Sequence, residues 1–238
     1  MRLLFAAILA LLPLPAWADV TATYSLGKQA LIVEADDGGN SRIGIDGKFG
    51  ILRRDGVDYV LMIQPSGETR VAELSEVLAL MSAVIAGESQ KGGAGGIIDK
   101  PFVLQAKGDA VVGGYTGAAW AFGPEQEADG RKGEMKEFVM SADPVLAPVG
   151  AIFARTVDVL LPLMRAIIPD STGFAAKARE LLATGTPLRV DTLFELKTVT
   201  TTEIDAKRFE LPAPVIPAME FLMAMEPGAG GSGFNPLP

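Results

Sequence analysis

Residues 36–63, DDGGNSRIGIDGKFGILRRDGVDYVLMI, decide the fold, because Asp-Gly pairs recur in them every nine residues. Asp-Gly between apolar runs favours a type I′ turn, in which both central residues need a positive φ. The runs between the pairs alternate apolar and polar side chains with the period of two of a half-buried strand. With a fourth turn at Ser66-Gly67, residues 20–73 are predicted to form an antiparallel meander. The three pairs are Asp37-Gly38, Asp46-Gly47 and Asp55-Gly56.

The meander begins with a clearly alternating strand. Every second residue from Val20 to Leu26 is apolar, and threonine or serine occupies the positions between them. Successive side chains of a strand point to opposite faces of the sheet, so this pattern predicts one buried face and one polar face. Residues 28–35 form the next strand, which pairs either with the first one or with the strand that begins at Arg42.

Residues 145–168 are the most apolar segment of the chain after its N-terminus. At 100° per residue, its charges Arg155, Asp158 and Arg165 fall within an arc of about 80°. The rest of the circumference is apolar, which is wider than one sheet-packing stripe requires. The segment is predicted to be one helix, or two short helices kinked at Pro162, and the interrupting charges and prolines argue against a membrane span.

Two other segments have helical spacing. Residues 74–86 carry an apolar i, i+3, i+4 stripe, and Gly87 occupies the position that a helix-ending glycine prefers. Residues 173–184 form the second segment, which Gly185 ends. The chain between these helices and after them is predicted to return to the sheet. The expected strands are residues 102–107, 110–122 and 135–141, and then strands within residues 188–211.

The first eighteen residues have the pattern of a secretory signal peptide. Arg2 is followed by an apolar run to Leu14 and by the cleavage signature Ala16-Trp17-Ala18. The apolar run is shorter than the roughly 20 residues that span a bilayer. Removal of 18 residues from 238 leaves 220, which predicts one domain over residues 19–226 with a disordered tail over residues 227–238. A periplasmic location is expected, with secretion as the alternative.

Composition narrows the functions that this chain can have. When Arg2 is subtracted from the 21 basic residues, 20 remain against 29 acidic ones, and a net charge near −9 disfavours nucleic acid and anionic membranes. The chain has no cysteine, so an acylated cysteine anchor is excluded and the fold depends on its hydrophobic core. We therefore expect neither a lipid anchor nor a membrane span.

The missing residue types also restrict catalysis. Without histidine or cysteine, the chain has no Ser-His-Asp triad, no cysteine nucleophile and no ordinary zinc or copper site. Ser25-Leu26-Gly27-Lys28 matches only one of the three β-lactamase elements, and the glycine run at residues 92–96 lacks the Lys-Ser/Thr of a phosphate loop. Met219, Met223 and Met225 have Cu(I)-binding side chains, which more often pack in a core. We predict a protein that is not an enzyme and has no cofactor or metal.

Apolar and aromatic residues are the remaining candidates for binding. The glycine-rich strand around residues 113–117 carries aromatic side chains that either line a ligand pocket or fill the core. The wide apolar face of residues 145–168 supplies others. The candidate ligand-binding residues are Tyr115, Trp120, Phe122, Phe138, Ile152, Val157, Leu160, Met164 and Phe194.

The order of elements resembles exported bacterial proteins with a LolA/LolB-like half-barrel architecture, which include several families of unknown function. The resemblance rests on a pattern of strands and turns at residues 42–45 and 49–59, at Gly113-Gly114-Tyr115 with Trp120, and at residues 209–212. It implies a strongly curved antiparallel sheet that is covered by helices, with a cavity between them for acyl chains or hydrophobic partners.

These observations predict an α+β fold with one curved antiparallel sheet of roughly eight to eleven strands. About three helices, over residues 74–86, 145–168 and 173–184, are expected against its concave face. The predicted function is a non-catalytic periplasmic binding or carrier protein for a lipid or acyl chain. The alternative is an envelope structural or protein-interaction module with a filled core and no small-molecule ligand.

Overall fold

The structure is a computed structural model, and it describes residues 19–45, 47–89, 101–125, 133–167 and 172–225. The expected signal peptide and the expected C-terminal tail lie outside these residues. The described part forms an eleven-stranded sheet with the order β6-β5-β4-β3-β2-β1-β11-β10-β9-β8-β7. Every pair of neighbouring strands is antiparallel. The predicted α+β class with one antiparallel sheet is confirmed.

The first six strands form the predicted meander. At the third Asp-Gly pair, Asp55 has a φ of 50° and Gly56 a φ of 83°, as a type I′ turn requires. The first pair behaves differently, because the positive φ falls on Gly39 and the Asp36 side chain accepts a hydrogen bond from the Asn40 backbone N–H at 2.7 Å. The strands are β1 Val20–Leu26, β2 Gln29–Ala35, β3 Ser41–Ile45, β4 Phe49–Arg54, β5 Val57–Ile63 and β6 Thr69–Glu73. Strand β2 pairs with both of its possible partners, β1 and β3.

The second half of the sheet corrects two predictions. The turn between β7 and β8 is at Gly113-Gly114, where both glycines have a positive φ, whereas Lys107 lies at a bulge within β7. Two successive glycines satisfy a tight turn better than Lys-Gly-Asp, which explains the difference. The strand expected to end at residue 211 is replaced by a 3₁₀ turn over Ala206–Phe209. The strands are β7 Phe102–Val112, β8 Tyr115–Pro124, β9 Lys136–Ser141, β10 Thr186–Val190 and β11 Phe194–Thr200.

The described residues contain four α-helices, one more than the sequence predicts. Gly87 lies within α2 rather than after it, and α3 is one helix that continues through Pro162. The added helix is α5, in the methionine-rich segment. The helices are α2 Leu74–Ser89, α3 Ala147–Ile167, α4 Thr172–Leu182 and α5 Ala218–Met225. A 3₁₀ turn over Pro144–Leu146 precedes α3 and is capped by the side chain of Asp143.

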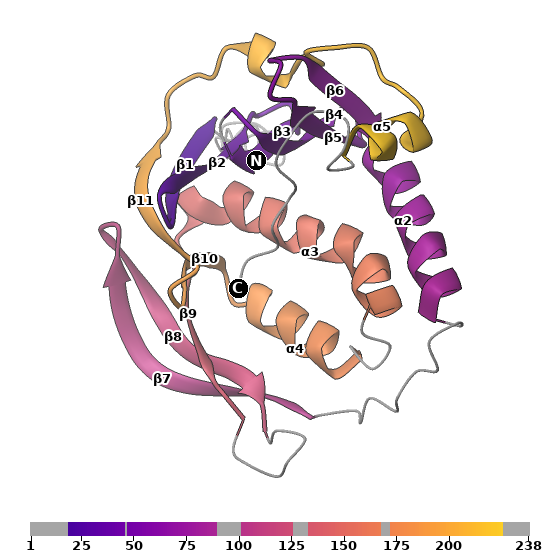
Figure 1. The fold of residues 1–238 in the computed structure, drawn as a ribbon. Helices are drawn as coiled ribbons and strands as arrows, with labels where there is room; N and C mark the ends of the chain where they lie inside the picture. Colours follow the sequence, from indigo (N-terminus) through magenta and orange to yellow (C-terminus); the bar gives the residue numbers. More distant parts are fainter. Residues whose placement is uncertain (1–18, 46, 90–100, 126–132, 168–171, 226–238) are drawn as a thin grey trace, which may run out of the picture.

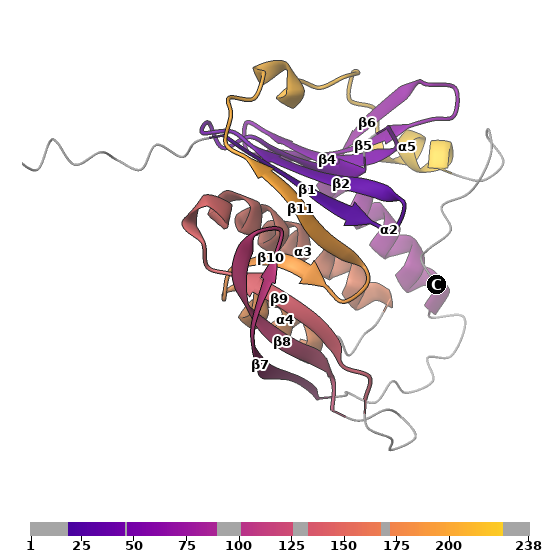
Figure 2. The same ribbon diagram turned by 90° about the vertical axis from the view of Figure 1, so that its left-hand side faces the viewer.

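The sheet is open and strongly curved, and Figure 1 shows it bending around α3 and α4. Helix α3 packs against β1, β2 and β10 and lies between α2 and α4. Seen from the side, β11 links the meander to the second half of the sheet (Figure 2). After β11 the chain crosses over the outer face of the meander before it reaches α5. We call residues 201–217 the strap.

Three groups of buried apolar residues hold these layers together. The first group joins β1, β2 and β11 to the N-terminal half of α3, and the second joins β5, β6, α2 and α5. The third lies on the opposite face of the meander, where Phe209 of the strap is buried against Leu52, Leu61 and Val71. The meander therefore has an inner face toward the helices and an outer face toward the strap, and both faces are packed.

Candidate ligand-binding surface inside the curved sheet

A charged cluster lies on the inner face of the meander, where α3 crosses it. Arg53 of β4 and Asp58 of β5 are cross-strand neighbours, and Nη1 of Arg53 lies 2.9 Å from Oδ2 of Asp58. Arg155 of α3 approaches from the helix side, with its Nε 3.5 Å from Oδ1 of Asp58 and its Nη2 donating to Ser41 Oγ at 2.5 Å. The side chains of Asp58 and Arg155 are only 16% and 29% exposed.

The electrostatics of this cluster leave a positive balance. Burial lowers the pKa of Arg155, while the Asp58 carboxylate opposes that effect and Arg53 adds to it. An arginine still keeps its proton at neutral pH, so two guanidinium charges share one carboxylate. Oδ1 of Asp58 is buried and makes no hydrogen bond in the described part of the chain, because 3.5 Å to Arg155 is too long. The cluster therefore has a net positive charge and one carboxylate oxygen without a hydrogen bond among the described residues.

The same elements become apolar directly beyond the charges. Ile51 lies two residues before Arg53 on the same face of β4, and Val60 lies two residues after Asp58 on the same face of β5. One helical turn after Arg155 is Val159 on α3. All three belong to the second apolar group. The inner surface thus changes from charged to apolar along β4, β5 and α3 together.

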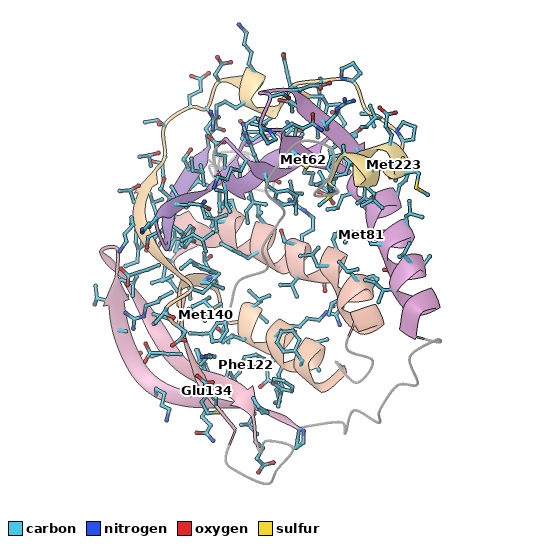
Figure 3. The ribbon with its side chains drawn as sticks, in the orientation of Figure 1. Met62, Met81, Phe122, Glu134, Met140 and Met223 are labelled. Atoms are coloured by element: carbon cyan, nitrogen blue, oxygen red, sulfur yellow. The ribbon has the colours of Figure 1, made fainter. Side chains whose placement is uncertain are left out.

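The apolar part of this surface is largely half-buried. Its fully buried nucleus consists of small or medium side chains from β5, β6 and α2 together with Ala218 and Phe221 of α5. A larger set surrounds that nucleus and keeps part of its area exposed. The set is Ile51, Met62, Leu80, Met81, Val159, Leu160, Leu163, Ile216, Leu222 and Met225. In Figure 3, Met62 and Met81 lie toward the interior, whereas Met223 points away from the molecule.

Helix α3 is exceptionally apolar for the little burial that it has. The segment Pro144–Leu163 has a mean hydropathy of 1.6, so that length and composition alone would allow it to cross a bilayer. Only 22% of its most apolar window is buried in the protein. The core helix of a soluble domain passes the same test of length and composition, but such a helix is mostly buried. Val149, Ile152 and Leu161 of α3 are fully buried, and its other large apolar side chains in this window are half-buried.

The predicted ligand-binding residues fall into separate groups. Phe122 and Phe138 belong to a ring cluster with Phe102 and Phe174, in which neighbouring ring centroids are 5.4–5.5 Å apart. Trp120 pairs with Phe138 across β8 and β9, and its Nε1 is buried without a hydrogen-bond partner among the described residues. These three predicted residues pack together below α4.

A second group of predicted residues lies in the first apolar group. Phe194 stacks on Phe153 at 5.5 Å, and both rings meet the ring of Tyr24 edge-on. The Tyr24 hydroxyl donates to the Pro187 carbonyl oxygen at 3.0 Å, and burial raises the pKa of Tyr24. Ile152 is buried in the same group and Tyr115 packs against it.

Two of the remaining predicted residues, Val157 and Leu160, lie on α3. Leu160 belongs to the half-buried set around the second apolar group, and Val157 is also half-buried. The side chain of Met164 lies outside the described part of α3. The eight predicted residues whose side chains are described fall in separate groups, and among them Leu160 contributes to the surface that joins the charges to the apolar set.

Sequence reasoning missed the charged cluster. The sequence indicates only a solvated turn or strand edge for the basic pair Arg53-Arg54, and a polar helix stripe for Arg155. The alternation of side chains along β4 and β5 could have revealed the cluster. It puts Arg53 and Asp58 on the same face of the sheet as Ile51 and Val60. The methionines of α5 do not form one site: Met219 and Met223 are exposed, whereas Met225 is half-buried.

Comparison with known proteins gives no further guide: no family model, no curated protein and no solved structure matches this chain. In the described residues, no group of three or more acidic, histidine or cysteine side chains is placed to hold a metal ion. The functional interpretation therefore depends on the geometry of the inner surface.

Proposed function

We propose that this protein is a non-catalytic binding or carrier protein for a lipid or acyl chain, exported to the periplasm. The ligand would lie between α2, α3, α5 and the inner face of β4 and β5. The observation that carries this proposal is the half-buried apolar set on α2, α3 and α5, because α3 is by length and composition as apolar as a membrane-spanning helix, yet few of its apolar side chains are fully buried.

The energetic argument is simple. Apolar surface gains about 25 cal/mol for each Å² removed from water, so covering roughly 200 Å² of the half-buried set yields about 5 kcal/mol. An apolar ligand removes the same surface from water without any change of fold, and a long flexible chain suits a surface assembled from five elements.

The charged cluster completes a surface with two kinds of contact. Arg53 and Arg155 lie where the apolar set begins, so they suit a polar head group on an apolar chain. Ser41 accepts its hydrogen bond from Arg155, a group that cannot take up a proton, so its hydroxyl is not activated as a nucleophile. This chemistry favours binding over catalysis.

The second candidate function is an envelope structural or interaction module without a ligand. The first apolar group favours it, because there the N-terminal half of α3 is closely packed by Tyr24, Phe194 and their neighbours. In that case the half-buried apolar side chains around α2 and α5 lie at the edge of a filled core and bind no ligand. Binding of an apolar probe separates the two functions.

The test uses N-phenyl-1-naphthylamine, an uncharged probe whose fluorescence rises in apolar surroundings. We expect saturable binding to the purified protein. Val159→Gln inserts an amide among the half-buried set and should weaken binding at least ten-fold, since burying an unpaired amide costs about 1–3 kcal/mol. The matched control is Val111→Gln on β7, where the valine is 69% exposed, and it should change binding by less than two-fold.

Thermal unfolding of both variants checks that they remain folded. If the protein gives no saturable fluorescence change, or if Val111→Gln and folded Val159→Gln weaken it equally, the inner surface is not the binding site. The interaction module would then be the better account.

A further inference from the structure

The outer face of the meander carries a hollow, on the side of the sheet away from α3. Its volume is about 240 Å³, and it lies between the strap and strands β3 to β6. A much smaller hollow of about 10 Å³ adjoins it, and Arg42 and Arg208 line both. The residues that line the larger hollow are Arg42, Ile45, Gly47, Lys48, Phe49, Gly50, Leu52, Leu61, Ile63, Thr69, Lys207, Arg208, Glu210, Leu211 and Pro212.

The strap is fixed to the sheet on both sides of this hollow. Arg208 donates two hydrogen bonds of 2.8 Å to the buried carboxylate of Glu34, and Phe209 is buried on the sheet next to it. Before the hollow, the Ile204 N–H donates to Asp19 at 2.6 Å, and after it the Ile216 N–H donates to the Val71 carbonyl at 2.8 Å. The wall of the pocket is therefore held in place before any ligand arrives, which lowers the ordering cost of binding.

The floor of the hollow owes its depth to two glycines. Gly44 and Gly50 are cross-strand partners in β3 and β4, so no side chain projects from the outer face at that point. A Cβ on Gly44 would lie 2.4 Å from the Phe49 carbonyl oxygen, which excludes any larger residue there. Leu52, Leu61 and Ile63 surround the gap and make the floor apolar.

The rim of the hollow is cationic in an otherwise acidic protein. Among the described residues that line it, four side chains are basic, those of Arg42, Lys48, Lys207 and Arg208, and one is acidic, that of Glu210. The whole chain has a formal charge of −8, so this balance is a local reversal. A cluster of positive charges beside an apolar floor attracts an anion and helps to hold it.

Arg42 is the group that points to a ligand. It is half-buried, it lines both hollows, and it makes no side-chain hydrogen bond or ion pair in the described part of the chain. Its neighbour across the strands is Glu34, whose two carboxylate oxygens are already engaged by Arg208. A half-buried guanidinium without a partner presents a fork of donors that matches a carboxylate.

We propose that this outer pocket binds a small carboxylate with an apolar body, held at its charged end by Arg42 and over its apolar part by Leu52, Leu61 and Ile63. The volume is slightly below the range of about 300–1,000 Å³ that is usual for drug-sized ligands, so the ligand is short. The pocket lies on the opposite face of the sheet from the proposed lipid surface, and the inference does not depend on that function.

Isothermal titration calorimetry with hexanoate, 1-hexanol and acetate tests the proposal. Hexanoate should bind at one site, more tightly than either acetate, which lacks the apolar body, or 1-hexanol, which lacks the charge. The affinity should fall as salt is raised, because the rim charges are partly exposed to solvent. Arg42→Gln should weaken hexanoate binding at least ten-fold, which corresponds to 1.4 kcal/mol.

Arg54→Gln is the matched control. Arg54 is on β4, on the same outer face of the sheet as Arg42, but it does not line the pocket, and in the described structure it pairs with the exposed Asp55. It should leave hexanoate binding within two-fold. If Arg42→Gln does not fold, the double variant Lys48→Gln/Lys207→Gln takes its place and should also weaken binding. Absence of hexanoate binding, equal binding of acetate or 1-hexanol, or an unchanged affinity in the folded pocket variants would overturn the proposal. Binding of the uncharged naphthylamine probe is measured separately and should not change in these variants. A negative result with hexanoate therefore rejects the outer pocket without rejecting the proposed lipid surface.

Discussion

Asp58 is the residue on which the charged cluster depends. It is the single carboxylate between Arg53 and Arg155, and neither arginine reaches another carboxylate in the described structure. Removing one partner of a fully buried ion pair costs about 3–5 kcal/mol, because the other charge stays buried and unpaired. The Asp58 side chain keeps 16% of its area exposed, so part of that cost is relieved by water.

We expect Asp58→Asn to lower the free energy of unfolding by about 2–3 kcal/mol, measured by urea denaturation. The change keeps the size of the side chain and removes only its charge. The control is Asp55→Asn, because Asp55 is 86% exposed and its ion pair with Arg54 lies in solvent. That substitution should change stability by less than about 0.5 kcal/mol. Equal effects of the two substitutions would show that the inner cluster does not stabilise the fold.

Tyr24 makes stability depend on alkaline pH. Burial raises its pKa in the folded protein well above the value of about 10 that it has in an unfolded chain. The neutral hydroxyl therefore contributes fully below pH 10, and stability falls as the pH rises above 10, by up to about 1.4 kcal/mol per pH unit. Tyr24→Phe cannot ionise, but it loses the hydrogen bond to Pro187 and should be about 1–2 kcal/mol less stable at pH 8.

The stability of the two proteins should therefore converge between pH 9 and pH 11, measured by urea denaturation at each pH. Other groups titrate over the same interval, but they are common to both proteins and cancel in the difference. A difference that stays constant over this interval would contradict the account of Tyr24.

At the scale of elements, the two glycines at the tip of the β7–β8 hairpin differ in how closely they approach β11. A Cβ on Gly113 would lie 3.0 Å from the Leu196 carbonyl oxygen on β11, whereas a Cβ on Gly114 would meet nothing within 4 Å. Both residues have a positive φ, so alanine costs about 1–2 kcal/mol of backbone strain at either position. Gly113→Ala should destabilise the protein by at least about 1 kcal/mol more than Gly114→Ala, in thermal or urea unfolding. Equal losses would mean that the tip of the hairpin does not pack on β11.

Local turn chemistry explains how much of the sheet could be predicted. Asp55-Gly56 locates the hairpin of β4 and β5 because a two-residue turn leaves the pairing little choice. The same rule was misapplied at Lys107-Gly108-Asp109, where a bulge resembles a turn and Gly113-Gly114 is the better turn. The pairing of β1 with β11 joins residues about 170 positions apart, and no local pattern carries that information.

The site was predicted less well than the fold, for a physical reason. The sequence predicts the site from wide apolar faces, but residues such as Ile152 and Phe194 pack against one another in a buried group. The distinguishing feature is incomplete burial, which only tertiary structure reveals. Arg53 and Arg155 meet across a helix–sheet interface, and Glu34, the cross-strand neighbour of Arg42, is engaged by Arg208 of the strap, which is distant in sequence.

On the scale of the whole molecule, one curved sheet separates the two surfaces proposed to bind ligands. Its inner face carries α3 and the half-buried apolar set, and its outer face carries the strap with its cationic pocket. The two faces alternate along each strand of the meander, so neighbouring residues such as Arg53 and Leu52 serve opposite sides. Substitutions on one face should therefore affect one kind of ligand and not the other.

The central claim is that the inner surface carries an apolar ligand. Native mass spectrometry of the protein, purified without detergent from the envelope of cells that produce it, tests this most directly. We predict a discrete adduct that is released on collisional activation and that organic extraction identifies as a lipid or acyl chain. A bare mass from the envelope, which stays bare after incubation with excess phospholipid and fatty acid, would contradict the claim.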